Sequence, residues 1–335
     1  MQWIEEADGV FRGGGVKGIA LAGALQGFAE HETKPVRRWV NVAGASAGAI
    51  IACYLALDHT AAEMAALLEQ TDCARFEDFP RGSKLLGAGN LVLNHGLARG
   101  DEFERWFDEV LDGASFERVK KEPEGGRERD WRLKLIAVDV TNRNLLVLPE
   151  DLARYKLPGK PALIDPDGFK IAGAARMSMS IPYFFEPVEL DHHETGRSMI
   201  IDGGTLSNFP VWLFDVDPDV VGRPPARPTF GFTLEGGRGF AAGLKAARAL
   251  VPWSLRFAFE IFHTATEAWD TRFVSHSTRV RTLAVDADDV GTTEFELSKE
   301  KQQLLLANGR NAARKFLESF RLEDYMNTFH ARPGG

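Results

Sequence analysis

The chain has 335 residues, of which 44% are apolar, and this is enough to bury the core of one large or two modest globular domains. Its formal net charge of -8 argues against a nucleic-acid partner, because phosphate backbones are bound through clustered lysine and arginine side chains. Only two cysteines occur, Cys53 and Cys73, so no disulfide framework is expected and a reducing compartment fits best.

The N-terminal region has no pattern of a targeting or membrane segment. The first residues, MQWIEEADGVF, carry acidic side chains where a signal peptide needs basic ones. Residues 41–57 lack charge, but the stretch is short, rich in glycine and alanine, and begins as a strand. We therefore interpret it as buried core and expect a cytoplasmic protein.

Strand-like and helix-like hydrophobic patterns alternate along the chain. Predicted strands cover residues 3–11, 37–43, 131–140, 145–149, 198–202, 228–234 and 278–286. Predicted helices cover residues 16–30, 46–57 and 60–71, and a last helix runs from Ser298, its N-cap, to Phe320. This alternation favours an α/β fold in which helices flank a parallel sheet.

The glycine-rich segment GGGVKG, residues 13–18, follows the first predicted strand and precedes a helix. Backbone N–H groups in such a segment, at the positive end of a helix dipole, can bind any anion. Three of its glycines satisfy the GxGxxG pattern, but the next strand ends without the acidic residue that dinucleotide binding requires. A P-loop is also disfavoured, because Ile19 and Ala20 stand where Lys and Ser or Thr should follow.

Residues 44–48, GASAG, place Ser46 between a predicted strand and a predicted helix. This is the arrangement of a nucleophile elbow, in which small neighbours permit a sharp turn that exposes the serine hydroxyl at a helix N-terminus. The alternative is that Ser46 only caps the helix within a packing contact of small residues. The motif alone leaves both interpretations open, and a group that accepts the serine proton decides between them.

The candidate proton acceptors for Ser46 are histidine and aspartate residues downstream in the chain. A catalytic triad would use His263, His276 or His330, but none of these follows a strand in a short polar loop. Asp202 instead ends an apolar strand, and in a parallel sheet the carboxyl ends of the strands line the crevice that holds a site. Asp202 is therefore a candidate base, and the alternative is an ordinary aspartate of an Asp-Gly turn.

Several short blocks resemble, in their order, those of the patatin-like phospholipase family. They are GGGVKG (13–18), GASAG (44–48), AARMSMSIPYFFEPV (174–188) with Ser178 and Pro182 at Ser-x-x-x-Pro positions, and DGG (202–204) followed by Asn208 and Pro210. Blocks in the correct order are far more specific than any one of them alone. The resemblance covers about residues 8–212.

The resemblance implies a single patatin-like catalytic domain over residues 1–335. Its fold would be a three-layer α/β/α sandwich with a mostly parallel central sheet and helical and loop elements as a cap. Residues 213–335 would complete the sheet and add helices.

The chemistry that the resemblance implies is a lipid acyl hydrolase of the phospholipase A or lysophospholipase type, with a Ser–Asp dyad and no cofactor. Ser46 would be the nucleophile, which forms an acyl-enzyme, and Asp202 the base. Because an aspartate with an ordinary pKa is a weak base, we expect burial to raise the pKa of Asp202. The alternatives are an acyltransferase that uses the same acyl-enzyme and a non-catalytic lipid-binding or storage protein.

The resemblance also gives the glycine loop a role. Gly13, Gly14 and Gly15 would form an oxyanion hole, with the N–H groups of Gly14 and Gly15 as donors, joined by that of Ala47. Lys17 matches a basic position of the family block and would bind a phosphate head group or stabilise the loop. An ordinary surface lysine is the alternative.

A lipid or phospholipid is the substrate class that the resemblance implies. Residues 250–274 carry Trp253, Phe257 and Phe262 at helical spacing, which suits a helix that lines an acyl pocket, touches a lipid surface or packs in the core. Peripheral membrane contact would need a local patch, because the net charge is acidic. An activating ligand or partner is compatible with the resemblance, but no motif in residues 213–335 identifies one.

The run Asp191-His192-His193-Glu194 contains residue types that bind metals. Neighbours in an extended segment point to opposite faces, however, and no second group has ligand spacing. We predict a polar hairpin before the strand at 198–202 and a reaction that needs no metal.

Overall fold

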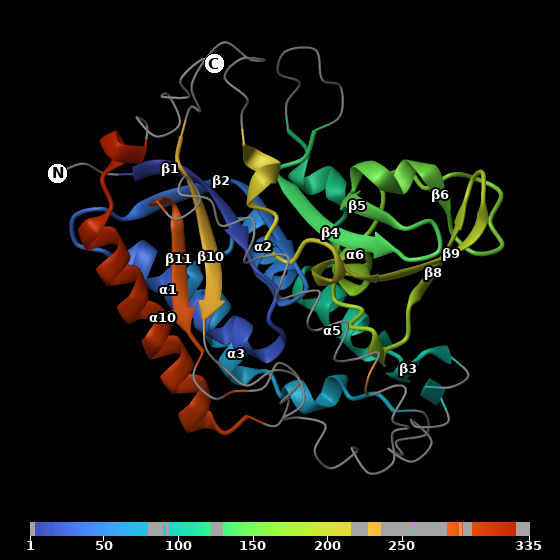
Figure 1. Cartoon of the computed structure of the whole chain (residues 1–335), viewed down its shortest axis with the longest axis horizontal. Coiled ribbons are helices and arrows are strands. Elements are labelled where there is room, and N and C mark those ends of the chain that lie inside the picture. Colours follow the sequence, from blue (N-terminus) through green and yellow to red (C-terminus); the bar gives the residue numbers. More distant parts are fainter. Residues whose placement is uncertain are drawn as a thin grey trace.

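The computed structural model describes residues 4–79, 90–91, 94–121, 130–215, 227–235, 280–287 and 297–325, together with positions 257 and 290. At its centre lies a nine-stranded sheet (Figure 1). The sheet runs in the order β11 (Thr282–Asp286), β10 (Thr229–Glu235), β1 (Ile4–Phe11), β2 (Val36–Ala45), β4 (Leu133–Asp139), β9 (Gly196–Asp202), β8 (Val188–His192) and β6 (Tyr155–Lys156), with β5 (Asn144–Leu148) paired to β4. Two short strands, β3 (Gly96–Ala98) and β7 (Tyr183–Phe185), form a second sheet.

The main sheet has a parallel part and an antiparallel part. Strands β11, β10, β1, β2 and β4 are parallel, whereas β9, β5, β8 and β6 join through antiparallel pairs. Antiparallel neighbours need only a short turn, and residues 193–195 form that turn between β8 and β9. The predicted α/β class with a large central sheet is confirmed, and so is the polar hairpin at 191–194.

Six helices of the described residues support the site and the core. They are α1 (Gly18–Glu30), α2 (Ala47–Ala56), α3 (Ala61–Gln70), α5 (Asp101–Val110), α6 (Ile171–Ser178) and α10 (Lys299–Ser319). Helix α10 lies beside α1 (Figure 1), and the Ser298 hydroxyl caps it by accepting the N–H of Lys301 at 3.4 Å, as predicted. The predicted strands and helices agree with these elements to within a few residues, and the predicted helix at 250–274 lies, apart from position 257, outside the described residues.

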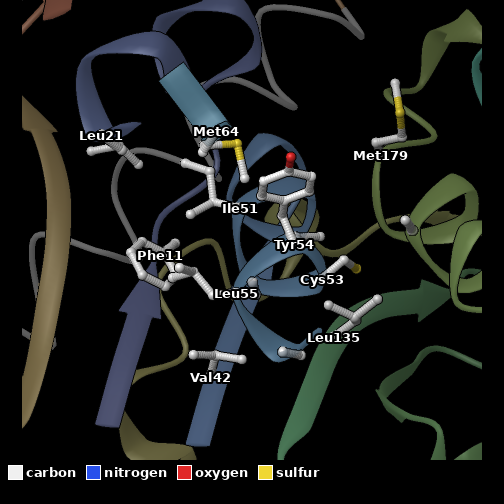
Figure 2. Packing of buried hydrophobic residues seen from close by; sticks show 14 of the residues in the cluster. Phe11, Leu21, Val42, Ile51, Cys53, Tyr54, Leu55, Met64, Leu135 and Met179 are labelled. Carbon is white, nitrogen blue, oxygen red and sulfur yellow. The ribbon is translucent and has the colours of Figure 1, made fainter. Parts of the chain in front are cut away.

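Helix α2 lies at the centre of the core, where it packs on the sheet. Ile51 and Leu55 extend from α2 toward Phe11 of β1, above Val42 of β2 (Figure 2). All four side chains are buried, and the aliphatic and aromatic surface that they remove from water stabilises the fold. The uncharged stretch 41–57 is therefore buried core, as the sequence predicted.

The opposite face of the sheet is also covered. Val10 of β1 and Ala43 of β2 point away from α2, as the alternation of side chains along a strand requires, and they pack against Val211. Val211 begins the 3-10 helix Val211–Phe214, which follows the DGG segment. None of the described helices combines the length and apolar character that crossing a membrane requires.

Candidate active site

Ser46 occupies the turn between β2 and α2 with an unusual backbone conformation. Its φ of 53° and ψ of -128° lie outside the regions that side-chain-bearing residues favour, at a cost on the order of 1–3 kcal/mol. A Cβ atom on Gly44 would lie 2.3 Å from the carbonyl carbon of Gly48, and one on Gly48 would lie 2.1 Å from the carbonyl oxygen of Phe11. The two glycines of GxSxG thus allow β1, β2 and α2 to approach closely enough to form the elbow.

The backbone of Ser46 is held from the end of helix α6. Its N–H donates to two acceptors of Ser178, the carbonyl oxygen at 3.2 Å and the Oγ atom at 3.1 Å. The Ser178 hydroxyl in turn donates to the carbonyl oxygen of Ile136 in β4 at 2.6 Å. These bonds hold the strained turn and occupy the Ser46 N–H.

Asp202 reaches this turn through an antiparallel strand. It lies opposite Ala137 of β4, and the preceding residue of β4, Ile136, pairs with Ala45 of β2, next to Ser46. The sequence argument relied on a parallel strand ending at the same edge as β2, and that step was wrong, because β9 is antiparallel to β4. The juxtaposition itself is present: the Ser46 side chain lies close enough to the Asp202 carboxylate to lower the pKa of that group.

Burial sets the protonation of Asp202, whose exposed fraction is 3%. Desolvation disfavours the carboxylate and raises the pKa of Asp202 to about 7. The Ser46 side chain and the Gly204 N–H, which donates to Oδ1 at 2.7 Å, oppose this rise in pKa. The carboxylate therefore accepts a proton more readily than an exposed aspartate would.

The glycine loop is joined to the segment after DGG by Asn208. The Gly13 N–H donates to the Asn208 carbonyl at 3.1 Å, and the Asn208 side-chain amide donates to the Gly13 carbonyl at 3.4 Å. Gly13, which the resemblance placed in an oxyanion hole, thus uses its N–H to hold the loop. Gly15 and Ala47 are the first residues of helices, where N–H groups have no intrahelical acceptor.

An apolar cavity opens beside Ser46. The empty space in and in front of it, open solvent included, is about 680 Å³. The glycine loop, the Ser46 turn, the helices α1, α2, α3 and α5 and the segments after α3 and α6 contribute its lining. The lining residues are Gly15, Val16, Gly18, Ile19, Ser46, Ala47, Ile50, Ile51, Leu68, Thr71, Cys73, Phe76, Phe103, Trp106, Met179 and Ile181. A cavity of this composition favours a hydrocarbon chain over a polar ligand.

The remaining candidates are Lys17, which the structure describes, and three histidines, which it does not. Lys17 is buried, with an exposed fraction of 8%, and a role in substrate binding stays a prediction. His263, His276 and His330 lie outside the described residues. In the part of the chain that the structure describes, no three or more His, Cys, Asp or Glu side chains are grouped as a metal site.

Three contributions to the site were not predicted from the sequence. The family block contained Ser178, and Asn208 was noted as a match after DGG, but neither was assigned a contact. Ser180, whose carbonyl oxygen accepts the Asp202 N–H at 2.9 Å, was not singled out at all. The available signal was the position of these polar residues inside blocks that otherwise read as small and apolar.

The family follows from comparison with known sequences. Residues 9–215 match the family model described as patatin-like phospholipase, and the chain belongs to this family. In general terms the family makes it a lipid acyl hydrolase.

Two individual relatives are similar in sequence. The uncharacterized protein YqhO of Bacillus subtilis (strain 168) is 38% identical over 321 residues, which cover 93% of this chain and 98% of YqhO. The uncharacterized protein R571 of Acanthamoeba polyphaga mimivirus is 24% identical over 207 residues, which cover 62% of this chain and 61% of R571.

Two solved structures are similar at lower identity. VipD from Legionella pneumophila aligns with a TM-score of 0.49 and 16% identity, covering 94% of this chain and 67% of VipD. The ExoU–SpcU complex from the type III secretion system of Pseudomonas aeruginosa aligns with a TM-score of 0.49 and 14% identity, covering 95% of this chain and 52% of the compared chain.

Proposed function

We propose that the protein is a serine acyl hydrolase of the phospholipase A or lysophospholipase type, with Ser46 as nucleophile and Asp202 as base. The observation that carries this proposal is the buried Ser46–Asp202 pair at the wall of an apolar cavity. A hydroxyl beside a buried carboxylate, next to space for a hydrocarbon chain, suits the cleavage of a fatty acyl ester.

The first half of the reaction forms an acyl-enzyme. Ser46 Oγ attacks the ester carbonyl while its proton passes to Asp202, and the raised pKa of Asp202 makes this transfer less unfavourable. The tetrahedral intermediate then collapses, the bond to the alcohol oxygen breaks, and Asp202 returns the proton to the leaving alcohol. The acyl chain stays attached to Ser46.

The second half releases the fatty acid. A water molecule attacks the acyl carbonyl while one of its protons passes to Asp202. The second intermediate then collapses, the bond between the acyl carbon and Ser46 Oγ breaks, and Asp202 returns the proton to Oγ, which restores the Ser46 hydroxyl. In both halves the negative oxygen is stabilised by N–H groups of Gly14, Gly15 and Ala47. Losing one such donor typically lowers kcat about 100-fold to 1000-fold.

The cavity supplies the binding energy for the acyl chain. Ile50 and Ile51 of α2 line it close to the nucleophile in sequence, and Phe103 and Trp106 contribute a wall from α5. Each methylene that leaves water contributes about 0.8 kcal/mol. A single hydrocarbon chain is therefore the part of the lipid that we assign to this cavity.

Reaction with a fluorophosphonate probe tests the proposal, because such probes modify an activated serine. The unsubstituted protein should be labelled on Ser46, as mapped by mass spectrometry, and should release fatty acid from a mixed lipid extract. Ser46→Ala should abolish both. Labelling that persists in this variant, or a lipid extract that stays unchanged, would contradict the proposal, and products formed with an added alcohol distinguish a hydrolase from an acyltransferase.

A further inference from the structure

One short segment contacts the backbone of both reacting residues. At its start, the carbonyl oxygen and Oγ of Ser178 accept the Ser46 N–H. Two residues later, the carbonyl oxygen of Ser180 accepts the Asp202 N–H at 2.9 Å. The segment 178–180 therefore spans the distance between the elbow after β2 and the end of β9.

The Ser178 hydroxyl joins three parts of the fold. It accepts from Ser46 and donates to the carbonyl oxygen of Ile136 in β4, so α6, the elbow and the sheet meet at this one atom. The Ser178 side chain is fully buried. Buried hydrogen bonds of this kind exchange little with water, and removing one partner leaves the other unsatisfied.

A buried arginine fixes the other end of the segment. The Arg176 guanidinium donates to Oγ of Ser180, to the carbonyl of Arg99 beside β3, and to the carbonyl of Glu186 after β7 at 2.8 Å. Its exposed fraction is 4%, and it lies 5.3 Å from the centre of the Phe185 ring. The rigid, multiply bonded side chain ties the segment to the small β3–β7 sheet.

The other residues of this stretch, Met179 and Ile181, contribute to the cavity wall and not to the polar contacts. Met179 and Ile181 line the cavity, whereas Ser178 and Ser180 make the polar contacts. Replacing a serine hydroxyl in this segment therefore alters the placement of the reacting groups without removing a cavity side chain.

We propose that Ser178 and Arg176 are positioning residues that set the placement of Ser46 relative to Asp202. This inference rests on the proposed function of Ser46 and Asp202. Ser178 acts by holding the N–H of the strained nucleophile turn, and Arg176 acts by fixing Ser180, whose carbonyl holds the base. Neither residue touches the substrate.

The test compares Ser178→Ala with Ser198→Ala. Ser198 is also fully buried and hydrogen-bonded, since its Oγ accepts from the Asn142 side chain at 2.8 Å, but it lies near the middle of β9, away from the elbow. Both variants remove one buried hydroxyl, so a purely structural effect should be similar in the two. Unfolding midpoints, kcat, KM and the rate of fluorophosphonate labelling are measured for each.

Ser178→Ala should lower kcat and the labelling rate at least about tenfold with KM nearly unchanged, because an interaction that orients the reacting groups is lost while the cavity is kept. Ser198→Ala should remain within about twofold of the unsubstituted protein. Ser178→Thr, which keeps the hydroxyl, should recover most of the labelling rate.

A second measurement reports the pKa of Asp202 through the pH dependence of kcat/KM. The Ser46 side chain lowers the pKa of Asp202, so loosening its placement should move the acid limb of the kcat/KM profile to higher pH in Ser178→Ala. Arg176→Lys, which keeps the charge but not the planar fork, should shift the same limb and lower kcat.

The outcomes separate the two proposals. If the unsubstituted protein is not labelled, the proposed function fails. If it is labelled and Ser178→Ala reacts at the same rate with the same pH profile, or is slowed no more than Ser198→Ala, the positioning role is overturned. If Ser178→Ala does not fold, Ser178→Cys and Arg176→Lys carry the same comparison, and normal labelling in both overturns it.

Discussion

Asp202 of β9 lies directly opposite Ala137 of β4, and this register determines where the carboxylate points. Successive side chains of a strand point to opposite faces, so a slip of one residue would direct Asp202 to the face that Val10 and Ala43 occupy. Because Ile136 pairs with Ala45 on the other side of β4, the same register also sets the distance from the Asp202 carboxylate to the turn at Ser46.

Replacing the base should abolish the reaction without unfolding the protein. Asp202→Asn keeps the size of the side chain and an oxygen that can accept the Gly204 N–H, but it cannot take the Ser46 proton. We expect kcat for a lipid ester to fall about 100-fold to 10 000-fold, the range typical of general bases. Near-unchanged kcat, with the circular dichroism spectrum intact, would exclude Asp202 as the base.

The same substitution should stabilise the fold at high pH. The pKa of Asp202 is raised from 3.8 to about 7 in the folded protein, so its contribution to stability is fully present below pH 3.8 and is lost as the pH rises through 7. At about pH 8 the buried charge should make the unsubstituted protein less stable than Asp202→Asn by up to about 4 kcal/mol.

Urea unfolding at about pH 8 and about pH 4.5 measures the difference in the free energy of unfolding between Asp202→Asn and the unsubstituted protein. This difference should be smaller at the lower pH, because the folded protein then holds a neutral carboxyl group. A difference that is independent of pH would show that Asp202 does not titrate in this range.

Activity should depend on the ionisation of the same group. Only the carboxylate form of Asp202 can accept the Ser46 proton, so kcat/KM should increase with pH and level off above a midpoint near 7. A neutral ester substrate removes ionisation of the substrate from the profile. An acid limb near the pKa of an exposed aspartate, about 4, would contradict the effect of burial.

Trp106 should limit the length of the acyl chain that the cavity accepts. Trp106→Leu enlarges a wall of the cavity, and each further methylene that it buries is worth about 0.8 kcal/mol, or about fourfold in kcat/KM. With a series of p-nitrophenyl esters, the optimum should move toward longer chains.

Trp131→Leu provides the matched control for this change. Trp131 is equally a buried tryptophan, its Nε1 donates to Asp167 at 3.0 Å, and it is not one of the residues that line the described cavity. Its replacement should leave the chain-length optimum in place. The same shift in both variants would mean that general loosening of the fold, and not the cavity wall, causes it.

The elbow was predictable from the sequence because its signals are local. Residues 44–48 combine a strand pattern, a serine between small residues and a helix pattern, and each of these depends on near neighbours alone. Asp202 was predictable as the end of a strand followed by two glycines. The direction of β9 was not, because antiparallel pairing with β4 is a contact between strands far apart in the chain.

The cavity was not predictable for a related reason. The aromatic residues considered for an acyl pocket were those in 250–274, whereas the described lining includes Phe76 and Phe103, which come from separate segments. Their ring centres lie 5.5 Å apart, and only the tertiary packing of α5 against the preceding turn brings them together. Neither residue lies in a predicted element, and a hydrophobic pattern alone does not distinguish a core residue from one that lines a cavity.

The alternation of residues 178–181 has a consequence for turnover. An acyl chain in the proposed binding cavity would contact Met179 and Ile181, and the carbonyls of Ser178 and Ser180 in the same stretch of backbone accept the N–H groups of Ser46 and Asp202. Substrates with short acyl groups should then bind without fully ordering that stretch. They should show a lower kcat as well as weaker binding. Residues 178–181 would therefore couple binding of the hydrocarbon chain to the alignment of Ser46 and Asp202.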